Sequence, residues 1–455
     1  MKKITMKALI FVFTVLGLWS VPERTGAMQI PRKMETCEDA DEWISIFLGE
    51  DPDALSGEWE MTPQMDAAVS SLGGMKGMAA SLAMLGKVKE IGSAYEGELQ
   101  GYKVFYIPCV FSLASVDLVL ATQDGAIAGL STGLYSGDKG KAEKPENTEN
   151  TAGFDSINLS LPVPALDGEL PGTLTVPEGD GPFPAVVLVH GSGPNDRDET
   201  VGSVKPFRDL AEGLAEKGIA VYRYDKRTYV YGNQMKDDRE ITLVEETIED
   251  AVNAAKLLAG QEKIDPERIF VLGHSLGGNA VPAIARELEH ESAGVRGFIM
   301  MAASPRPLDE LMREQYDFLY SLMPELTEEQ QAEKDSVFEE LDKLQDLDAL
   351  SEDDTVMGIY LPYWRWLADY DILKAAEEMT LPCLLLQGEE DYQVTMEDFA
   401  LWKEAIGEME NWKMISYPGL THCFTPGQKT EGSAVYARQE TVDGQVIEDI
   451  AEFIN

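Results

Sequence analysis

Two stretches of this 455-residue chain carry the pattern G-x-S-x-G, which marks a nucleophilic serine when it lies on a sharp strand-to-helix turn: GLSTG at 129–133 and GHSLGG at 273–278. Ser275 follows the apolar run RIFVL and precedes a helix-forming stretch, AVPAIARELEHE. On such a turn the hydroxyl stands clear of the sheet, and the helix N-terminus favours developing negative charge. Ser131 instead leads from a predicted strand end into a Gly- and Lys-rich segment, so Ser275 is the predicted nucleophile.

A serine hydroxyl is a weak nucleophile until a base takes its proton, and the chain has four histidines. His274 adjoins the serine on the turn, His290 ends a predicted helix in a charged run, and His190 precedes a glycine loop. His422, in LTHCF, follows the last predicted strand and precedes the terminal helix. That position matches the chain order serine, acid, histidine, so we predict His422 as the base.

The acid that orients this histidine is expected at the end of a strand between the two. Three carboxylates compete in GEED, directly after the strand CLLLQ. We favour Asp391, because its spacing from Gly388 suits the turn that holds such an acid, and we keep Glu390 as the second candidate. Such a carboxylate fixes the imidazole tautomer and stabilises its protonated form.

A tetrahedral intermediate with a negatively charged oxygen also needs hydrogen-bond donors. HGSGP at 190–194 follows the strand AVVLV, where the backbone N–H of Ser192 can point at that oxygen. The N–H of Leu276, the residue after the nucleophile, is the second predicted donor. A Gly-rich loop without a catalytic role could have the same sequence. The segment HGSGP is predicted, however, at the same sheet edge as Ser275, Asp391 and His422, and this position favours an oxyanion hole.

The elements that position these residues are predicted from the alternation, after about residue 154, of short apolar runs with helix-length amphipathic stretches such as 205–217 and 244–258. This alternation predicts an α/β fold with a mostly parallel sheet covered by helices. The predicted strands are 185–191, 219–225, 268–275, 295–303, 381–391 and 411–419.

One connection, residues 304–380, is far longer than the roughly dozen residues that a crossover needs. Apolar residues recur in it at helical spacing, and YLPYWRWLADYD at 360–371 concentrates aromatic residues. The insertion is either a helical lobe whose apolar face packs on the body or a lid that lines a substrate pocket, and both can hold. The recurring residues are Val337, Phe338, Leu341, Leu344 and Leu347.

The first 27 residues resemble a secretory signal peptide. Lysines at positions 2, 3 and 7 precede an apolar run from Ala8 to Trp19, and small residues around Ala27 suit cleavage. A membrane span needs about 20 apolar residues, so a permanent anchor is the weaker alternative. The mature chain is therefore expected to be secreted or extracytoplasmic.

Residues 28–135 are predicted to form a small α+β domain, with helical stretches at 39–48 and 61–87 and a hairpin turning at Asp124-Gly125. The polar segment 136–153 lacks apolar periodicity and is predicted as a linker. The catalytic domain is then 154–455, with the insertion inside it.

Composition excludes some partners. A formal net charge of −44 argues against binding nucleic acid or an anionic membrane. The four cysteines allow a Cys37–Cys109 bridge or buried free thiols, and none has the spacing of a zinc site, so neither metal nor other cofactor is expected. The sequence does not determine the oligomeric state.

Several charged residues flank the predicted oxyanion loop, and they have two interpretations. They form either a buried polar network beside the loop or ordinary, weak ion pairs on loops, and we favour the second. They are Asp196, Arg197, Asp198, Asp225 and Arg227.

Five segments, HGSGPNDRDET, YRYDKR, GHSLGG, GEEDYQV and LTHCF, occur in that order. With them, residues 154–455 resemble secreted bacterial α/β-hydrolases of the serine esterase and acyl-CoA-thioesterase-like group, related to dienelactone hydrolases. Such proteins often carry a small N-terminal α+β domain of unknown function. The resemblance implies a serine hydrolase of small carboxylic esters or thioesters, without cofactor, using Ser275, Asp391 and His422 and the N–H groups of Ser192 and Leu276. A serine peptidase and a non-catalytic binding protein of the same fold are the alternatives.

Overall fold

The computed structural model divides the chain into two compact units, Met1–Glu146 and Asn147–Asn455. The predicted signal peptide and nearly all of the predicted linker lie outside the described residues, so both of them, and the boundaries between them, stay predictions. No helix in the described ranges is long and apolar enough to cross a membrane. The structure describes residues 31–49, 51–62, 65–66, 69, 74–80, 82, 87–99, 102–111, 115–134, 153–235, 238–290, 294–323, 326 and 328–455.

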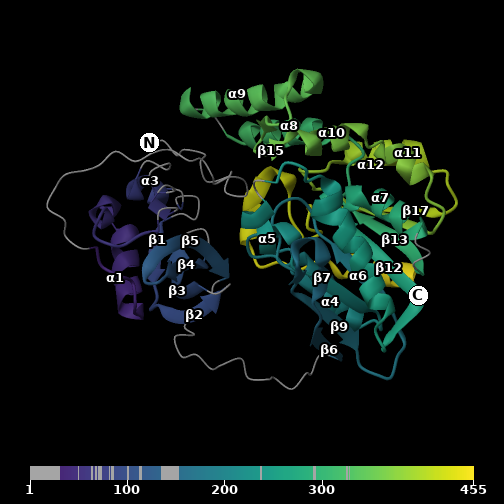
Figure 1. Ribbon diagram of the computed structural model, residues 1–455, viewed down its shortest axis with the longest axis horizontal. Coiled ribbons are helices and arrows are strands. Elements are labelled where there is room, and N and C mark those ends of the chain that lie inside the picture. Colours follow the sequence, from purple (N-terminus) through teal and green to yellow (C-terminus); the bar gives the residue numbers. More distant parts are fainter. Residues whose placement is uncertain are drawn as a thin grey trace. The chain divides into compact units, whose positions relative to one another are not determined.

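The larger unit is built on an eight-stranded sheet in the order β17-β16-β13-β12-β10-β11-β9-β6 (Figure 1). The strands from β17 to β11 run parallel, whereas β9 and β6 pair antiparallel at one edge. All six predicted strands are present, and the predicted α/β fold is confirmed. Their bounds are β6 (Phe154–Asn158), β9 (Gly172–Pro177), β10 (Phe183–Val189), β11 (Ala220–Tyr224), β12 (Ile264–His274), β13 (Val295–Met301), β16 (Cys383–Gly388) and β17 (Trp412–Tyr417).

The central strands read as continuous apolar runs because both of their faces are buried. In β10, Val187 and Val189 face a core shared with helices α6, α7, α11 and α12, whereas Val186 and Leu188 face a second core shared with α4 and α13. Helices thus cover both faces of the sheet, and its carboxyl edge stays open for loops. The helices are α4 (Pro206–Ala215), α5 (Arg227–Met235), α6 (Glu249–Ala259), α7 (Leu276–His290), α11 (Ile372–Glu377), α12 (Met396–Ile406) and α13 (Gly444–Ile454).

The segment between β13 and β16 is mostly helical. Two of its predicted apolar residues, Leu344 and Leu347, line a pocket described below, whereas Leu341 is fully buried. The predicted helical run from Val337 to Leu347 changes at Asp342, where α9 gives way to a 3₁₀ segment. The elements of this segment are α8 (Leu308–Ser321), α9 (Glu328–Asp342), a 3₁₀ segment (Lys343–Ala349), β14 (Thr355–Val356), β15 (Ile359–Tyr360), α10 (Leu361–Asp369) and α11.

The smaller unit holds a five-stranded antiparallel sheet, whose buried face packs on helix α1 through Trp43 and Phe47. The predicted hairpin is confirmed, with Asp124 and Gly125 both at positive φ between β4 and β5. The predicted helix at 61–87 is wrong at its start, because Met61 forms a β-bridge with Ile127. The elements are α1 (Cys37–Phe47), a 3₁₀ turn (Pro52–Leu55), α3 (Met75–Ala80), β1 (Val88–Ile91), β2 (Tyr95–Leu99), β3 (Tyr102–Phe111), β4 (Ser115–Gln123) and β5 (Ala126–Leu134).

The cysteines are all free thiols, so the structure has no Cys37–Cys109 bridge. Burial raises the pKa of the Cys109 thiol to about 12. This thiol is therefore protonated at neutral pH and unreactive.

Candidate active site

Ser275 lies on the sharp turn between β12 and α7, at a φ of 54° that a non-glycine residue rarely adopts. Its N–H donates to the carbonyl of Met301 on the neighbouring strand, at 2.9 Å. Such backbone strain persists only where the surroundings hold it, and it is commonest at functional sites. Ser131, by contrast, lies within β5 opposite Val119, and not at a strand end as the sequence suggested.

The glycines around Ser275 are required by close backbone approach. A Cβ on Gly273 would lie 2.2 Å from the carbonyl oxygen of Gly277, and a Cβ on Gly277 would lie 2.2 Å from that of Val189. Neither contact can be relieved by turning a flexible side chain. The turn therefore needs glycine at both positions.

Replacing Gly277 by alanine is expected to destabilise the larger unit by about 1–3 kcal/mol or more, because the added methyl group must push β10 away. Thermal unfolding monitored by circular dichroism measures this loss. Gly232→Ala is the control, since Gly232 lies in α5 and a Cβ added there would meet no atom within 4 Å. Its melting temperature should stay or rise, because alanine is the better helix former. Equal melting temperatures for both variants would contradict the close-approach argument.

His422 and Asp391 lie in contact beyond the ends of β17 and β16. Nδ1 of His422 is 2.7 Å from Oδ2 of Asp391, and both residues are buried. The other carboxylate oxygen, Oδ1, accepts the N–H groups of Gln393 at 2.7 Å and Val394 at 3.0 Å. These two donors fix the carboxylate, and the carboxylate in turn orients the imidazole with Nδ1 as the donor.

Glu390, the second candidate for the acid, accepts a hydrogen bond from the backbone N–H of Lys429 at 3.1 Å. Glu389 accepts from the hydroxyl of Ser416 at 2.8 Å. Of the three carboxylates in GEED, Asp391 is thus the one that contacts His422.

The two predicted oxyanion donors belong to residues near Ser275. Leu276 is the first residue of α7, and the loop that carries Ser192 packs directly against Ser275, because a Cβ on Gly191 would lie 3.1 Å from the Cβ of Ser275. Among the described residues, neither the N–H of Ser192 nor that of Leu276 donates to a protein acceptor. Both N–H groups are therefore free to bind a ligand oxygen.

Two buried residues that the sequence analysis did not assign, Glu199 and His274, connect the oxyanion loop to His422. Oε1 of Glu199 accepts the N–H of Gly191 at 2.7 Å, and Oε2 lies 2.9 Å from Nδ1 of His274. The other ring nitrogen of His274 lies 2.9 Å from the carbonyl oxygen of His422. Burial alone would lower the pKa of His274, but the Glu199 carboxylate outweighs it and the pKa is raised.

Four of the five charged residues beside the predicted oxyanion loop form ion pairs, and Asp225 and Arg227 are buried, unlike the weak loop pairs that the sequence analysis favoured. Arg197 makes a two-pronged contact with Asp225, at 3.0 and 2.8 Å, whereas Arg227 pairs with Asp250 on α6. Lys226, which lies between Asp225 and Arg227 in the sequence, donates a hydrogen bond to the carbonyl of Gly191 in the predicted oxyanion loop. No sequence pattern distinguishes Lys226 from its neighbours. His190, at the start of the loop, is fully buried, and burial lowers its pKa to about 4, so it stays neutral.

Comparison with known proteins gives consistent matches. The model of the family described as serine aminopeptidase, S33, matches residues 181–426. Esterase EstD of Thermotoga maritima is 35% identical over 374 residues, which are 82% of this chain and 84% of that protein. Among solved structures, Est1E from Butyrivibrio proteoclasticus is 18% identical with a TM-score of 0.42, covering 65% of this chain and 96% of that one. The dienelactone hydrolase from Anabaena variabilis is 16% identical with a TM-score of 0.39, covering 66% and 97%.

The family match includes the predicted oxyanion loop, Ser275, Asp391 and His422, and the match to EstD extends over most of the chain. An eight-stranded, mostly parallel sheet with a serine on the turn after a central strand is the fold on which such families are built. The chain therefore belongs to the serine aminopeptidase S33 family of α/β-hydrolases.

Proposed function

We propose that this protein is a serine hydrolase that cleaves small carboxylic esters or thioesters through an acyl-enzyme intermediate. The observation that carries the proposal is the buried contact between His422 and Asp391, formed at the strand edge that also holds Ser275 on its strained turn. The similarity to an esterase over 82% of the chain supports the choice of esters.

In the proposed reaction, Oγ of Ser275 attacks the carbonyl carbon while Nε2 of His422 takes the hydroxyl proton. The carbonyl oxygen becomes an oxyanion and accepts the N–H groups of Ser192 and Leu276. The intermediate collapses, the bond to the leaving alcohol or thiol breaks, and His422 donates its proton to that group. Water then attacks the acyl-enzyme by the same steps, releasing the acid and restoring Ser275.

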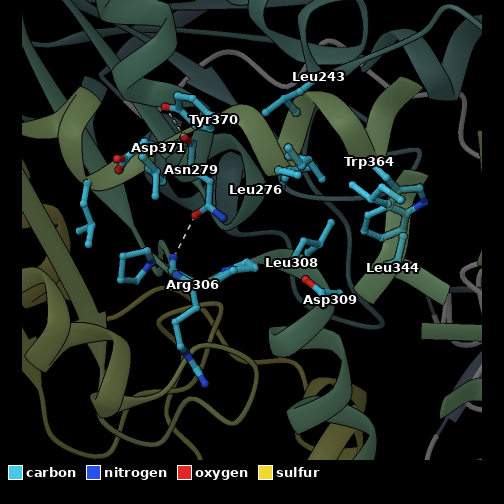
Figure 2. A pocket seen from close by; sticks show the side chains of 18 residues that line it. Leu243, Leu276, Asn279, Arg306, Leu308, Asp309, Leu344, Trp364, Tyr370 and Asp371 are labelled. Carbon is cyan, nitrogen blue, oxygen red and sulfur yellow. Dashed lines mark hydrogen bonds between the residues drawn. The ribbon is translucent and has the colours of Figure 1, made fainter. Parts of the chain in front are cut away.

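A pocket of about 370 Å³ begins at Leu276, the residue after the nucleophile, and Figure 2 shows the side chains that surround it. Its volume lies near the lower end for small-molecule sites. Most of its apolar wall comes from the insertion between β13 and β16, so we propose that residues 304–380 act as a lid that binds the apolar part of the substrate. The apolar lining residues from this segment include Leu308, Leu344, Leu347, Trp364, Leu367 and Leu373.

Three polar side chains of this pocket, those of Arg306, Asn279 and Asp371, already have protein partners, whereas the lining carboxylate of Asp309 has none among the described contacts. Arg306 is held by the buried carboxylate of Asp398 at 2.8 Å and by Glu314. The side-chain oxygen of Asn279 accepts the N–H of Ser304, as the dashed line in Figure 2 shows, and Asp371 caps helix α11. The guanidinium of Arg306 is therefore not free to bind an anionic substrate, and the mostly apolar lining suits an alkyl or aryl group.

Filling this pocket is expected to shorten the range of esters that react. Leu347→Trp should lower kcat/KM for p-nitrophenyl octanoate about 10-fold or more while leaving the acetate within about threefold, because each buried methylene contributes about 0.8 kcal/mol. Leu322→Trp is the matched control, since Leu322 is exposed in the same insertion and does not line the pocket. If kcat/KM depends on the length of the acyl chain in the same way in both variants, the acyl group does not bind in this pocket.

The experiment that tests the function is a substrate screen of the purified protein with p-nitrophenyl esters, acyl thioesters and aminoacyl p-nitroanilides, together with fluorophosphonate labelling. We expect turnover of esters or thioesters and a single labelled residue, Ser275. The description of the matched family as a serine aminopeptidase makes peptide cleavage the second candidate. Turnover confined to the anilides would establish that candidate instead, and no turnover with no labelling would favour a binding protein.

We also propose that the mature chain works outside the cytoplasm. The three lysines and the apolar run of the first 27 residues support this proposal. N-terminal sequencing of the protein from the extracytoplasmic fraction of a bacterial host should begin at or near Met28. A product that keeps Met1 would overturn it.

A further inference from the structure

The peptide unit between Gly191 and Ser192 joins two groups that matter to the proposed oxyanion hole. Its N–H belongs to Ser192, and its carbonyl belongs to Gly191. This carbonyl accepts hydrogen bonds from Nζ of Lys226 at 2.7 Å and from Nδ2 of Asn195 at 3.2 Å. Because the peptide bond is trans, its C=O and N–H point in opposite directions. The groups that fix the carbonyl therefore also fix the direction of the Ser192 N–H.

Lys226 is held in place by an acidic partner inside the protein. Only 2% of Lys226 is exposed, and its ammonium lies 2.5 Å from Oε1 of Glu246, which is also buried. The second oxygen of Glu246 accepts the hydroxyl of Tyr363 at 2.6 Å. Tyr363 lies on α10, beside pocket-lining Trp364.

The local backbone at Glu246 is unusual. Residues Val244–Ile248 form a π-helical turn directly before α6. Such turns are rare and occur often at functional sites. Here the turn carries the carboxylate that faces Lys226.

We propose that Lys226, fixed by Glu246, is a positioning residue that orients and polarises the Gly191–Ser192 peptide so that the Ser192 N–H binds the oxyanion. This inference rests on the proposed function. A cation at the carbonyl draws electron density from the peptide and makes its N–H a stronger donor, as in any chain of hydrogen bonds at low dielectric. A donor that is already aligned stabilises the transition state without reorganisation.

Burial of an ion pair is not by itself a sign of function, so the contact of Lys226 with the carbonyl of Gly191 is what distinguishes this pair. A buried ion pair gives little net stability compared with apolar residues of similar size. The neighbouring pair of Arg227, the first residue of α5, and Asp250, on α6, is also buried, with contacts at 2.6 and 2.9 Å. No described contact joins Arg227 or Asp250 to the oxyanion loop, so this pair is the matched control.

The test compares two double variants that each remove a whole buried pair. In Lys226→Met with Glu246→Gln, kcat should fall about 10²–10³-fold, the loss typical of one oxyanion donor, with KM within about threefold. The affinity for an alkyl trifluoromethyl ketone, whose adduct with Ser275 carries the same oxyanion, should fall in parallel. Arg227→Met with Asp250→Asn should leave both quantities within about threefold of the wild-type values.

Tyr363→Phe is the second variant, because it removes one hydroxyl and is not expected to prevent folding. It should lower kcat and ketone affinity by several-fold without changing KM, since Glu246 loses a donor that fixes it. If both the Lys226 double variant and Tyr363→Phe keep normal kcat and ketone affinity, the inference is overturned. If the double variant does not fold, the Tyr363→Phe result alone decides in the same way.

The proposed function has a separate readout. Loss of activity in Ser275→Ala supports it whatever the Lys226 variants do. Retention of activity in Ser275→Ala overturns the function, whereas a normal Lys226 double variant beside an inactive Ser275→Ala overturns this inference alone.

Discussion

Replacing Ser275 by alanine is expected to lower kcat for p-nitrophenyl butyrate by roughly 10⁶-fold, the loss found when a catalytic serine is removed. Without Oγ no acyl-enzyme can form, and His422 has no hydroxyl to deprotonate. The residual rate should still exceed that in water by about 10³–10⁴-fold, because the oxyanion donors and the pocket remain. Steady-state kinetics with the purified variant measure the loss, and mass spectrometry should detect no acylated protein.

Ser131→Ala is the control, because Ser131 occurs in the other G-x-S-x-G match. Its backbone lies inside β5 of the smaller unit, which pairs antiparallel with β4 and places Ser131 opposite Val119. Its kcat should stay within about twofold of the wild-type value. Comparable losses in both serine variants would mean that the turn after β12 is not the catalytic one.

The arrangement of the larger unit could be predicted because its signals are local. A strand buried on both faces reads as a continuous apolar run, and β10, β12 and β16 all show one. The candidate site residues follow the ends of these strands and of β17, where side chains from different strands meet. Spacing after each strand selected Asp391 and His422, which lie in contact, whereas the pairing of Ser275 with His422 stays a prediction.

The residues around the site could not be predicted because their partners are distant in sequence. Glu246 is 20 positions from Lys226 and 117 from Tyr363, and nothing in the acidic stretch VEET marks it. Glu199 was one carboxylate among several in DRDET, and His274 was set aside because it adjoins Ser275. A charged residue in a sequence is expected to be exposed to solvent, because burying it without a partner costs free energy. Only the folded structure shows that these side chains are buried together with their partners.

The start of the predicted helix at 61–87 failed for a related reason. Its composition suits a helix, and Met65, Asp66 and Val69 are helical, as is α3 from Met75, but Met61 pairs with Ile127 at the edge of the sheet. Tertiary pairing outweighed local propensity there.

Asp391→Asn is expected to lower kcat by about 10⁴-fold while the fold is kept. Oδ1 of Asp391 accepts two backbone N–H groups, so the amide oxygen of an asparagine must take that place. Its NH₂ group then occupies the position of Oδ2, where it cannot accept from Nε2 of Gln387, and donates to Nδ1 of His422. The imidazole proton is forced onto Nε2, which can no longer accept the proton of Ser275. The rate should therefore recover partly at high pH, where hydroxide can deprotonate the serine directly.

Glu390→Gln separates this account from a general effect of charge near the site. The backbone N–H of Lys429, which Glu390 accepts, can bind the amide oxygen of glutamine equally well, and Glu390 makes no described contact with His422. Its kcat should stay within about threefold of the wild-type value. If Glu390→Gln shows the large loss and Asp391→Asn does not, the acid is Glu390. The contact between Asp391 and His422 would then stabilise the structure without setting the tautomer of His422. Nitrogen-15 spectra measure directly which ring nitrogen of His422 carries the proton. We expect the proton on Nδ1 in the wild type and on Nε2 in Asp391→Asn, since this exchange explains a large loss of kcat without a change in folding.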